Sequence, residues 1–318
     1  MLITVIIPCY RSAKTIERVV EEIKTEILKR PGNRYQIILV NDCSPDNTFE
    51  VLTKIAENDR RVVALDLSRN YGQNNARLAA IPYVKGDVAV CMDDDGQHPA
   101  NQIYNLVDKI CEGYDLVYAK FPKQKQTFFR RLASRAHTGL QELTGAKLKG
   151  IFNSPFLAWS SFSIKALKQY HSPFVSAGAY LMRLTNRVAN VDAEQRSRME
   201  GKSNYTLKKL LNLWLTEFTN FSLVPLRFSS LLGFISAALG VLLGVILVIR
   251  KLVNPMIAVG YTSTVTFILI IGGIIMLMLG LLGEYVGKIY MTISNQPQYM
   301  VRTELNVTEE VEKETVSV

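Results

Sequence analysis

The sequence predicts an α/β fold with a parallel-rich sheet domain, followed by interfacial amphipathic helices and a two-helix transmembrane hairpin. Over residues 1–120, short apolar runs typical of strands alternate with helical segments, and this alternation favours a parallel sheet. After residue 227, two long stretches carry no charged side chain, as membrane spans require. We therefore expect a soluble domain over 1–227, a hairpin over 228–290 and a C-terminal tail over 291–318.

Strands and helices are expected to alternate within the soluble domain. The strands are the apolar runs 2–8, 36–42, 62–68, 87–93 and 115–118, and the clearest helices are 13–29 and 101–112. Two further stretches, 123–143 and 205–222, repeat apolar side chains at helical spacing, with Lys or Arg on other faces. Such helices suit an anionic membrane surface. Packing against the soluble domain is the alternative for either stretch taken alone.

The hairpin is expected to contain spans over 228–249 and 257–283. The first run has 22 uncharged residues, which form about 33 Å of helix and so cross a bilayer core. The connecting loop holds only Arg250 and Lys251, whereas more basic side chains flank the hairpin: Lys202, Lys208, Lys209, Arg227, Lys288 and Arg302. This asymmetry predicts a membrane protein whose soluble domain and both termini are cytoplasmic.

Composition excludes several classes of protein. A chain with 48% hydrophobic residues and a mean hydropathy of +0.11 is neither disordered nor fibrous. The net charge is +9, but residues 303–318 hold five Glu and one Lys, so we expect an acidic tail that is disordered from residue 303. The four cysteines form no CxxC pair, which argues against a disulfide framework and a zinc site. The N-terminal apolar run is too short for a signal peptide.

Acidic side chains follow two of the expected strands. Asp93, Asp94 and Asp95 come directly after an apolar run, and Gln97 follows them. Adjacent carboxylates at 4 Å repel by about 1 kcal/mol per pair in water and by more in protein, and a hard cation such as Mg²⁺ or Mn²⁺ relieves that repulsion. Asp42 ends the second strand at the same edge, where parallel sheets bind ligands. A solvated acidic turn and a helix cap are the simpler interpretations of these two features.

A second group of candidate residues is mostly basic and lies between the sheet and the spans. Arg matches phosphate geometry with paired donors, and Lys adds a point charge. We expect Arg196, Arg198, Lys202 and Ser203 to hold a lipid phosphate, with general attraction to anionic headgroups as the alternative. Lys120, Arg130 and Arg131 belong to the basic stretch 120–149, which suits an anionic membrane surface. Nucleic acid is not an expected partner, because these residues gather where lipid is the nearer polyanion.

In this order, the features resemble the GT-A fold glycosyltransferases of family 2 that act on polyprenyl phosphates. That family includes dolichol-phosphate mannose synthase and the undecaprenyl-phosphate glucosyl and aminoarabinose transferases. The resemblance covers about residues 2–302. The segments that carry it are 5–10, 41–44, 67–73, 93–99, 129–130, 198–205 and 280–290.

The resemblance implies a metal-dependent, inverting transfer of one sugar from a nucleotide sugar to undecaprenyl phosphate. The donor it implies is a UDP-sugar, and the product serves cell-envelope glycan or lipid modification. It implies nucleotide contacts at Pro8, Tyr10, Asp42, Arg69 and Asp93. It also implies that Asp93, Asp95 and Gln97 hold Mg²⁺ or Mn²⁺, and that the catalytic residues are Asp93, Asp95, Arg130 and Arg198. The residues it implies for the acceptor phosphate are Lys120, Arg130, Arg131, Arg196, Arg198, Lys202 and Ser203. Gly-rich spans that can pack closely are compatible with a homo-oligomer.

Some residues depart from the family pattern. Asp94 stands where the family usually has a small residue, and Arg11 and Ser12 stand where it usually has Asn-Glu. These changes leave the sugar and the base open, and they motivate a second hypothesis of a non-catalytic membrane anchor or assembly partner. A processive polysaccharide synthase is a third hypothesis. It is disfavoured because no QxxRW motif occurs and because two spans make a poor export channel.

Overall fold

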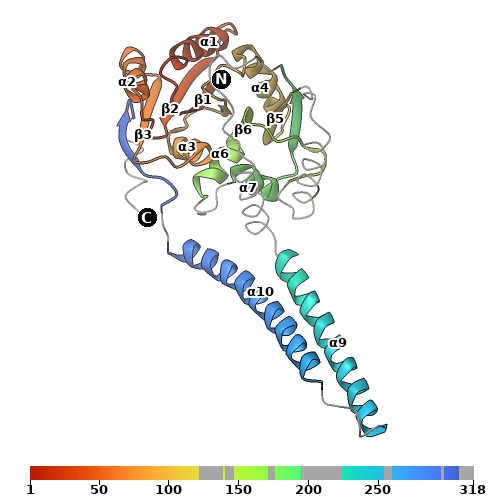
Figure 1. The fold of residues 1–318 in the computed structure, drawn as a ribbon. Helices are drawn as coiled ribbons and strands as arrows, with labels where there is room; N and C mark the ends of the chain where they lie inside the picture. Colours follow the sequence, from red (N-terminus) through yellow and green to blue (C-terminus); the bar gives the residue numbers. More distant parts are fainter. Residues whose placement is uncertain are drawn as a thin grey trace. The chain divides into compact units, whose positions relative to one another are not determined.

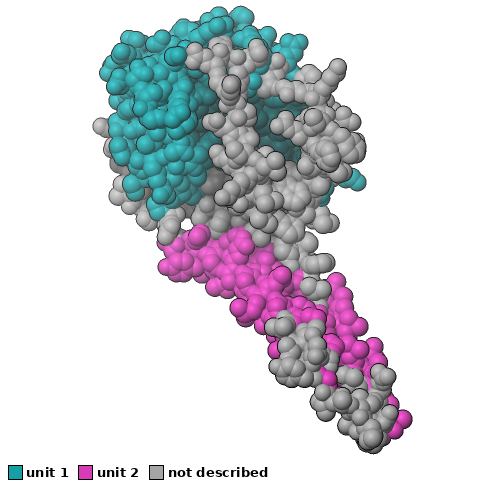
Figure 2. All heavy atoms as spheres, viewed as in Figure 1, with its two compact units in different colours: residues 1–205, 296–318 teal, residues 206–295 magenta. Residues whose placement is uncertain are grey.

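The structure is a computed structural model of the chain. It describes residues 1–121, 147–170, 176–194, 224–253, 260–294 and 297–307, together with Gly139 and Arg196. The chain forms two compact units, residues 1–205 with 296–318 and residues 206–295 (Figure 2). The amphipathic stretches expected over 123–143 and 205–222 lie outside the described residues, apart from Gly139.

The first unit is built on one mixed sheet (Figure 1). Among the described residues its strand order is β7-β5-β6-β4-β1-β2-β3-β8. Strands β1 to β4 are parallel neighbours, as are β5 and β7, whereas β6 and β8 run antiparallel to the strands beside them. The bounds are Leu2–Cys9 (β1), Arg34–Asn41 (β2), Val62–Leu67 (β3), Val88–Cys91 (β4), Leu116–Lys120 (β5), Leu157–Ser160 (β6), Val188–Asp192 (β7) and Val301–Leu305 (β8). The predicted α/β class with a parallel-rich sheet is confirmed.

Helices cover both faces of this sheet, because successive side chains of a strand point to opposite faces. Along β1, Ile3, Val5 and Ile7 enter one apolar core, whereas Ile6 enters the other. The first core is closed by α1 (Ile16–Leu28), α2 (Thr48–Asn58) and α4 (Ile103–Cys111), and the second by α3 (Gln73–Ala80), α6 (Ser161–Lys168) and α7 (Ala177–Leu184). The central strands are therefore buried on both faces, which is why they read as continuous apolar runs.

Strand β8 shows that the expected disorder from residue 303 is wrong for residues 303–307. Val301–Leu305 pairs with β3 and completes the edge of the sheet. Its side chains make specific contacts: the Tyr83 hydroxyl donates to Glu304, and Arg302 Nη2 donates to the Ser68 carbonyl at 3.1 Å. The backbone pairing available on β3 outweighs the polar composition of the segment. Residues 308–318 lie outside the described residues.

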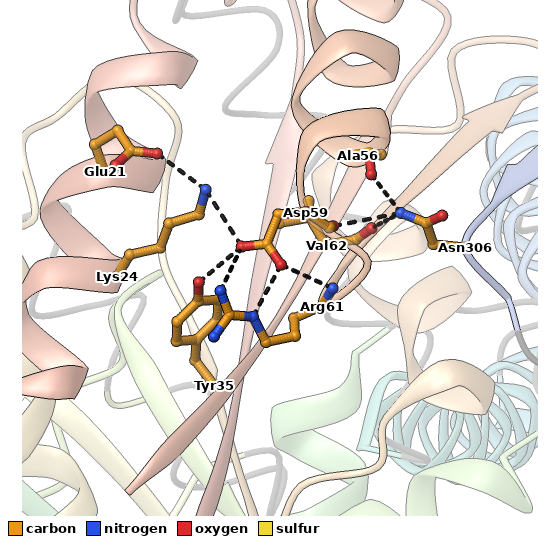
Figure 3. Close-up of polar contacts among 8 residues, drawn as sticks. All are labelled: Glu21, Lys24, Tyr35, Ala56, Asp59, Arg61, Val62 and Asn306. Atoms are coloured by element: carbon orange, nitrogen blue, oxygen red, sulfur yellow. Dashed lines mark hydrogen bonds and ion pairs between the residues drawn. The ribbon is translucent and has the colours of Figure 1, made fainter. Parts of the chain in front are cut away.

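Asn306 fastens the end of β8 to the loop between α2 and β3 (Figure 3). Its Nδ2 donates to the carbonyls of Ala56 at 2.6 Å and Val62 at 2.8 Å. The same loop is held by Asp59, which accepts from the Tyr35 hydroxyl at 2.7 Å and from Arg61 Nε at 2.9 Å. Asn306 has a φ of 59°, a left-handed conformation that Asn tolerates better than most residues.

We expect Asn306→Gly and Asn306→Ala both to destabilise the first unit, with Ala the worse of the two. Gly accepts the left-handed backbone and loses only the side-chain hydrogen bonds, at about 1 kcal/mol. Ala loses the same bonds and adds a backbone cost of about 1–2 kcal/mol. Thermal unfolding of the full chain in detergent measures the order. A Gly variant as stable as the unaltered chain would show that the side chain contributes nothing.

The second unit contains two long apolar helices, α9 (Val224–Val253) and α10 (Tyr261–Ile293). Each is long and apolar enough to cross a membrane, with mean hydropathies of 2.2 over Ser229–Ile246 and 1.9 over Ile270–Ile293. Large apolar side chains on both are exposed, including Phe234 at 73% and Met276 at 71%. That exposure disfavours an interpretation as buried core helices and fits lipid as their surroundings. The helices approach closely at Gly233, where a Cβ atom would lie 2.6 Å from Met278 Cε.

Candidate functional site

The candidate site lies where β1 to β4 end. In this parallel group Cys9 pairs with Asn41 and Asn41 with Asp66, so the carboxyl ends of these strands share one edge. The segments that follow the strands are 10–12, 42–44, 68–72 and 92–97. Two residues there, Arg11 and Cys43, have left-handed backbones without being glycine, with φ of 59° and 51°. Such conformations cost of order 1–3 kcal/mol each and gather at functional sites.

Asp42 is buried under the loop that follows β3. Its Oδ1 accepts from the Tyr71 N–H at 2.7 Å and its Oδ2 from the Gly72 N–H at 2.9 Å. Gly72 has a φ of 85°, which only glycine adopts readily. Burial raises the pKa of Asp42, and the two N–H donors oppose that rise. The Asp42 carboxylate thus fixes the loop 70–72 at this edge of the sheet. A ligand that binds Asp42 would share the carboxylate oxygens with the N–H groups of the loop.

The other expected nucleotide contacts are at the same strand ends. Tyr10 is 46% exposed, and Arg11 lies over its ring at 5.5 Å from the ring centre. Arg69 is also exposed and lies 4.7 Å from the centre of the Tyr71 ring. Pro8 is buried within β1, where it pairs with Val40. Exposed aromatic and guanidinium planes offer stacking surfaces for a planar base, whereas Pro8 shapes the strand end.

The segment 93–97 follows β4 and presents the acidic cluster. Asp93 Oδ1 accepts from Gln73 Nε2 at 2.5 Å and from Arg77 Nη2 at 3.1 Å. Asp95 Oδ1 accepts from the Gln97 N–H at 3.0 Å, which closes a tight turn around Gly96. Asp93 and Asp95 thus accept hydrogen bonds from different donors, and these bonds reduce the repulsion between the adjacent carboxylates.

Asp94 points toward the segment after β1. Its Oδ2 accepts from the Tyr10 N–H at 3.0 Å and from the Ser12 hydroxyl, and its carbonyl accepts from Thr15 Oγ1 at 2.8 Å. Burial raises the pKa of Asp94 to about 6, because these hydrogen bonds only partly offset the loss of water. Asp94 thus ties two strand-end segments together, and the geometry gives it a structural role rather than a place beside Asp93.

We expect Asp94→Asn to disturb the 10–12 segment and leave Mn²⁺ affinity unchanged. Both hydrogen bonds end on Oδ2, so an amide oxygen in that position can keep them as neutral bonds, and the loss is about 1 kcal/mol. Ser12→Ala removes the partner hydroxyl and serves as the matched variant. Thermal unfolding and Mn²⁺ titration of the full chain measure the two effects. A large drop in Mn²⁺ affinity for Asp94→Asn alone would contradict the structural role.

Of the expected phosphate-binding residues, the structure describes Lys120 and Arg196. The Arg196 N–H donates to the Gln97 carbonyl at 3.0 Å, so its main chain adjoins the acidic segment. Its guanidinium, however, pairs with Glu22 of α1 at 3.0 Å. Lys120 ends β5 and lies 3.9 Å from Asp192. The other members of that group, Arg130, Arg131, Arg198, Lys202 and Ser203, lie outside the described residues.

The acidic segment suits a cation that a substrate helps to bind. The described part of the chain contains no group of three or more His, Cys, Asp or Glu side chains arranged to hold a metal ion. Asp93, Asp95 and Gln97 nevertheless supply oxygen donors only, and Mg²⁺ is usually held by one or two carboxylates plus substrate phosphates. The donor set therefore fits a hard divalent cation.

Three residues of the site were not predicted from the sequence: Gln73, Arg77 and His98. His98 is buried, and its Nδ1 accepts from the Asp93 N–H at 3.0 Å. Its ring stacks on Phe156 and Phe121, with centres 5.0 and 5.6 Å apart. Burial lowers the pKa of His98, which keeps the ring neutral and able to accept this bond. In the sequence, the indication that His98 belongs to the site is its position five residues after Asp93.

Known proteins match the chain over most of its length. Residues 4–184 match the model of glycosyl transferase family 2, and residues 224–289 match that of the GtrB C-terminal hairpin. Undecaprenyl-phosphate 4-deoxy-4-formamido-L-arabinose transferase of Edwardsiella ictaluri is 32% identical over 94% of this chain and 93% of its own. The enzyme of that name from Klebsiella pneumoniae is 30% identical over 98% and 96%.

A solved structure shares the fold of the first unit. Mannosyl-3-phosphoglycerate synthase from Rubrobacter xylanophilus superposes with a TM-score of 0.50 at 16% identity. The match covers 68% of this chain and 71% of that one. At this identity the likeness concerns the arrangement of strands and helices, and it agrees with the α/β sheet described above.

Proposed function

The chain belongs to glycosyl transferase family 2, and on that premise we propose that it moves one sugar from a UDP-sugar to undecaprenyl phosphate. The observation that carries this proposal is the full-length likeness to undecaprenyl-phosphate sugar transferases, joined to an oxygen-rich site at the carboxyl edge of the sheet. The product is a lipid-linked sugar for cell-envelope glycan or lipid modification.

The donor nucleotide occupies the edge formed by the ends of β1 to β3. Tyr10 and Arg69 offer their planes to the base, and Asp42 with its loop offers hydrogen-bonding groups. Pro8 shapes the floor of this part of the site. The arrangement is supported by the burial of Asp42 and the exposure of Tyr10 and Arg69.

Asp93, Asp95 and Gln97 hold Mg²⁺ or Mn²⁺ in this proposal. When bound, the cation supplies positive charge that stabilises the leaving diphosphate. Within this chain, the Asp95–Gln97 turn orients the carboxylate of Asp95. Hydrogen bonds donated by Gln73 and Arg77 orient the carboxylate of Asp93.

In this proposal the basic residues expected from the sequence bind the acceptor phosphate. One of its oxygens bonds to C1 of the sugar while the bond from C1 to the diphosphate oxygen breaks, so the configuration at C1 inverts and UDP leaves. A phosphate is largely ionised near neutral pH, so no strong general base is required. Arg130 and Arg198 are assigned to this phosphate as catalytic residues, with Lys120, Arg131, Arg196, Lys202 and Ser203 around it.

Helices α9 and α10 cross the inner membrane as a hairpin, with the sheet domain and both termini in the cytoplasm. The apolar exposed surfaces of the helices and the likeness to a C-terminal hairpin support the membrane hairpin. The basic side chains that flank the hairpin in the sequence support the orientation. Protease added to inverted vesicles is expected to digest the sheet domain. Protection of that domain in inverted vesicles would contradict the orientation.

The test is transfer by the purified full chain. Protein, Mn²⁺ or Mg²⁺, undecaprenyl phosphate and a panel of nucleotide sugars are incubated together, and nucleoside diphosphate release and lipid mass are read in parallel. We expect release of UDP with a gain of one sugar on the lipid. Gain of many sugars would indicate a polymerising synthase, and no release from a folded protein would favour a non-catalytic role.

A further inference from the structure

A buried arginine lies behind the acidic segment. Arg77 is 7% exposed and sits on α3, within the otherwise apolar run 76–81. Its Nη2 donates to Asp93 Oδ1 at 3.1 Å, and its Nε has no hydrogen-bond partner among the described residues. Gln73, one helical turn earlier, donates to the same oxygen at 2.5 Å. Two donors from one face of α3 thus converge on one carboxylate oxygen.

The burial of Arg77 is costly unless its charge is paired. Arginine stays protonated in proteins, so it cannot escape the cost by releasing its proton, as lysine does. The ion pair that the structure gives Arg77 is with Asp93, whose side chain is 18% exposed. Removing one member of a buried pair is strongly destabilising. Arg77 and Asp93 therefore depend on each other even without a ligand.

The segment that carries Arg77 also holds Asp42, the acidic residue of the site that follows β2. The Tyr71 and Gly72 N–H groups bind the carboxylate of Asp42, and Gln73 and Arg77 follow directly with Asp93. Residues 71–77 therefore contact an acidic residue after β2 and another after β4. One short element thereby sets the positions of both carboxylates.

We propose that Arg77 is a positioning residue that, with Gln73, fixes the carboxylate of Asp93 in one orientation before any cation or nucleotide binds. This inference rests on the proposed function, in which Asp93 is a metal ligand. Preorganised ligands bind more tightly, because less orientational freedom is lost on binding. Arg77 acts through Asp93 and makes no contact with substrate in this role.

The first test measures the coupling without any ligand. Arg77→Met, Asp93→Asn and the double variant are compared by thermal unfolding of the full chain in detergent with metal removed. We expect each single change to lower the midpoint by about 5 °C or more, and the double variant to lose less than the sum of the two. Additive losses would overturn the pairing.

The second test measures Mn²⁺ alone, by the electron paramagnetic resonance of the unbound ion. We expect the dissociation constant to rise about tenfold in Arg77→Met, the scale seen when partners of metal ligands are removed. Arg77→Lys keeps the charge without the planar fork and should also weaken binding. Unchanged or tighter Mn²⁺ binding in Arg77→Met would leave Arg77 a purely structural residue.

Two further variants complete the design. Gln73 is exposed at the start of α3, so Gln73→Ala should fold even where Arg77→Met does not, and a rise of about threefold in the Mn²⁺ dissociation constant is expected because one of two donors remains. Arg30→Met removes a surface pair with Asp108 at 2.6 Å and should leave Mn²⁺ binding unchanged. Full affinity in Gln73→Ala would contradict the role of the α3 donors.

The outcomes separate this proposal from the proposed function. An unaltered chain that binds Mn²⁺ with the expected dependence on Arg77, but transfers no sugar, would refute the donor or acceptor and leave the positioning role standing. An unaltered chain that transfers sugar normally, with Mn²⁺ affinity indifferent to Arg77, would refute the positioning role alone. Failure of the unaltered chain to bind Mn²⁺ both alone and with UDP present would overturn the positioning of a metal ligand.

Discussion

Asp95→Asn is expected to reduce sugar transfer by about a thousandfold with little change in folding. A bound cation contributes several kcal/mol to stabilising developing charge, and each 1.4 kcal/mol is a factor of ten in rate. Asparagine keeps the size of the side chain and an oxygen that can accept from the Gln97 N–H, which now lies 3.0 Å from Asp95 Oδ1. The turn should therefore persist while the charge that attracts the cation is lost.

The measurement is the initial rate of UDP release at saturating Mn²⁺, with lipid mass as the second readout. Asp87→Asn is the matched control, because Asp87 precedes the same strand β4 at its opposite end and is exposed. Its carboxylate accepts from the Leu2 N–H at 3.0 Å, far from the acidic segment that follows the strand. Chelation of metal should reduce the unaltered chain to the level of Asp95→Asn, and wild-type turnover by Asp95→Asn would refute the metal assignment.

The sequence was sufficient to predict strands β1 to β5. Each predicted strand is found with its ends within two residues of the predicted ones, because strands buried on both faces are necessarily apolar throughout. Strand β6 was missed: Leu157–Ser160 is four residues long and too short to show a period. Strand β8 was missed because its pairing with β3 depends on a partner more than 230 residues away, which local composition does not reveal.

Some residues of the candidate site could likewise be predicted from the sequence, and others could not. Asp42 and Asp93 could be placed from the sequence because they directly follow strands, and parallel strands end at one edge. The role of Asp94 could not be predicted, since the direction of its side chain depends on the Tyr10 N–H and the Ser12 hydroxyl, which follow a different strand. Arg77 was also missed, although a lone charge inside the apolar run 76–81 was a signal that its side chain is buried and paired.

Asp42→Asn is expected to weaken UDP binding at least tenfold while leaving the affinity for Mn²⁺ alone unchanged. Both oxygens of Asp42 accept backbone N–H groups of the loop 71–72, and an amide can supply only one acceptor. The other N–H would then face an NH₂ group, which costs about 1–3 kcal/mol for a buried unsatisfied donor. The loop that carries Tyr71 and adjoins Arg69 should loosen, and a cost of this size corresponds to about tenfold or more in affinity.

Calorimetric titration of the full chain with UDP, in the presence and absence of Mn²⁺, tests this expectation. Asp46→Asn is the matched control: Asp46 lies four residues after Asp42 in the connection between β2 and α2, is exposed, and accepts from the Thr48 hydroxyl at 2.6 Å. It should bind UDP as the unaltered chain does. Asp42 contacts the loop before α3, whereas Gln73 and Arg77 contact Asp93. If Asp42→Asn loses affinity for UDP but not for Mn²⁺, the two ends of the 71–77 segment act independently. Equal loss of Mn²⁺ affinity in Asp42→Asn would instead mean that the segment moves as one rigid piece, and that the nucleotide and metal sides of the site cannot be altered independently.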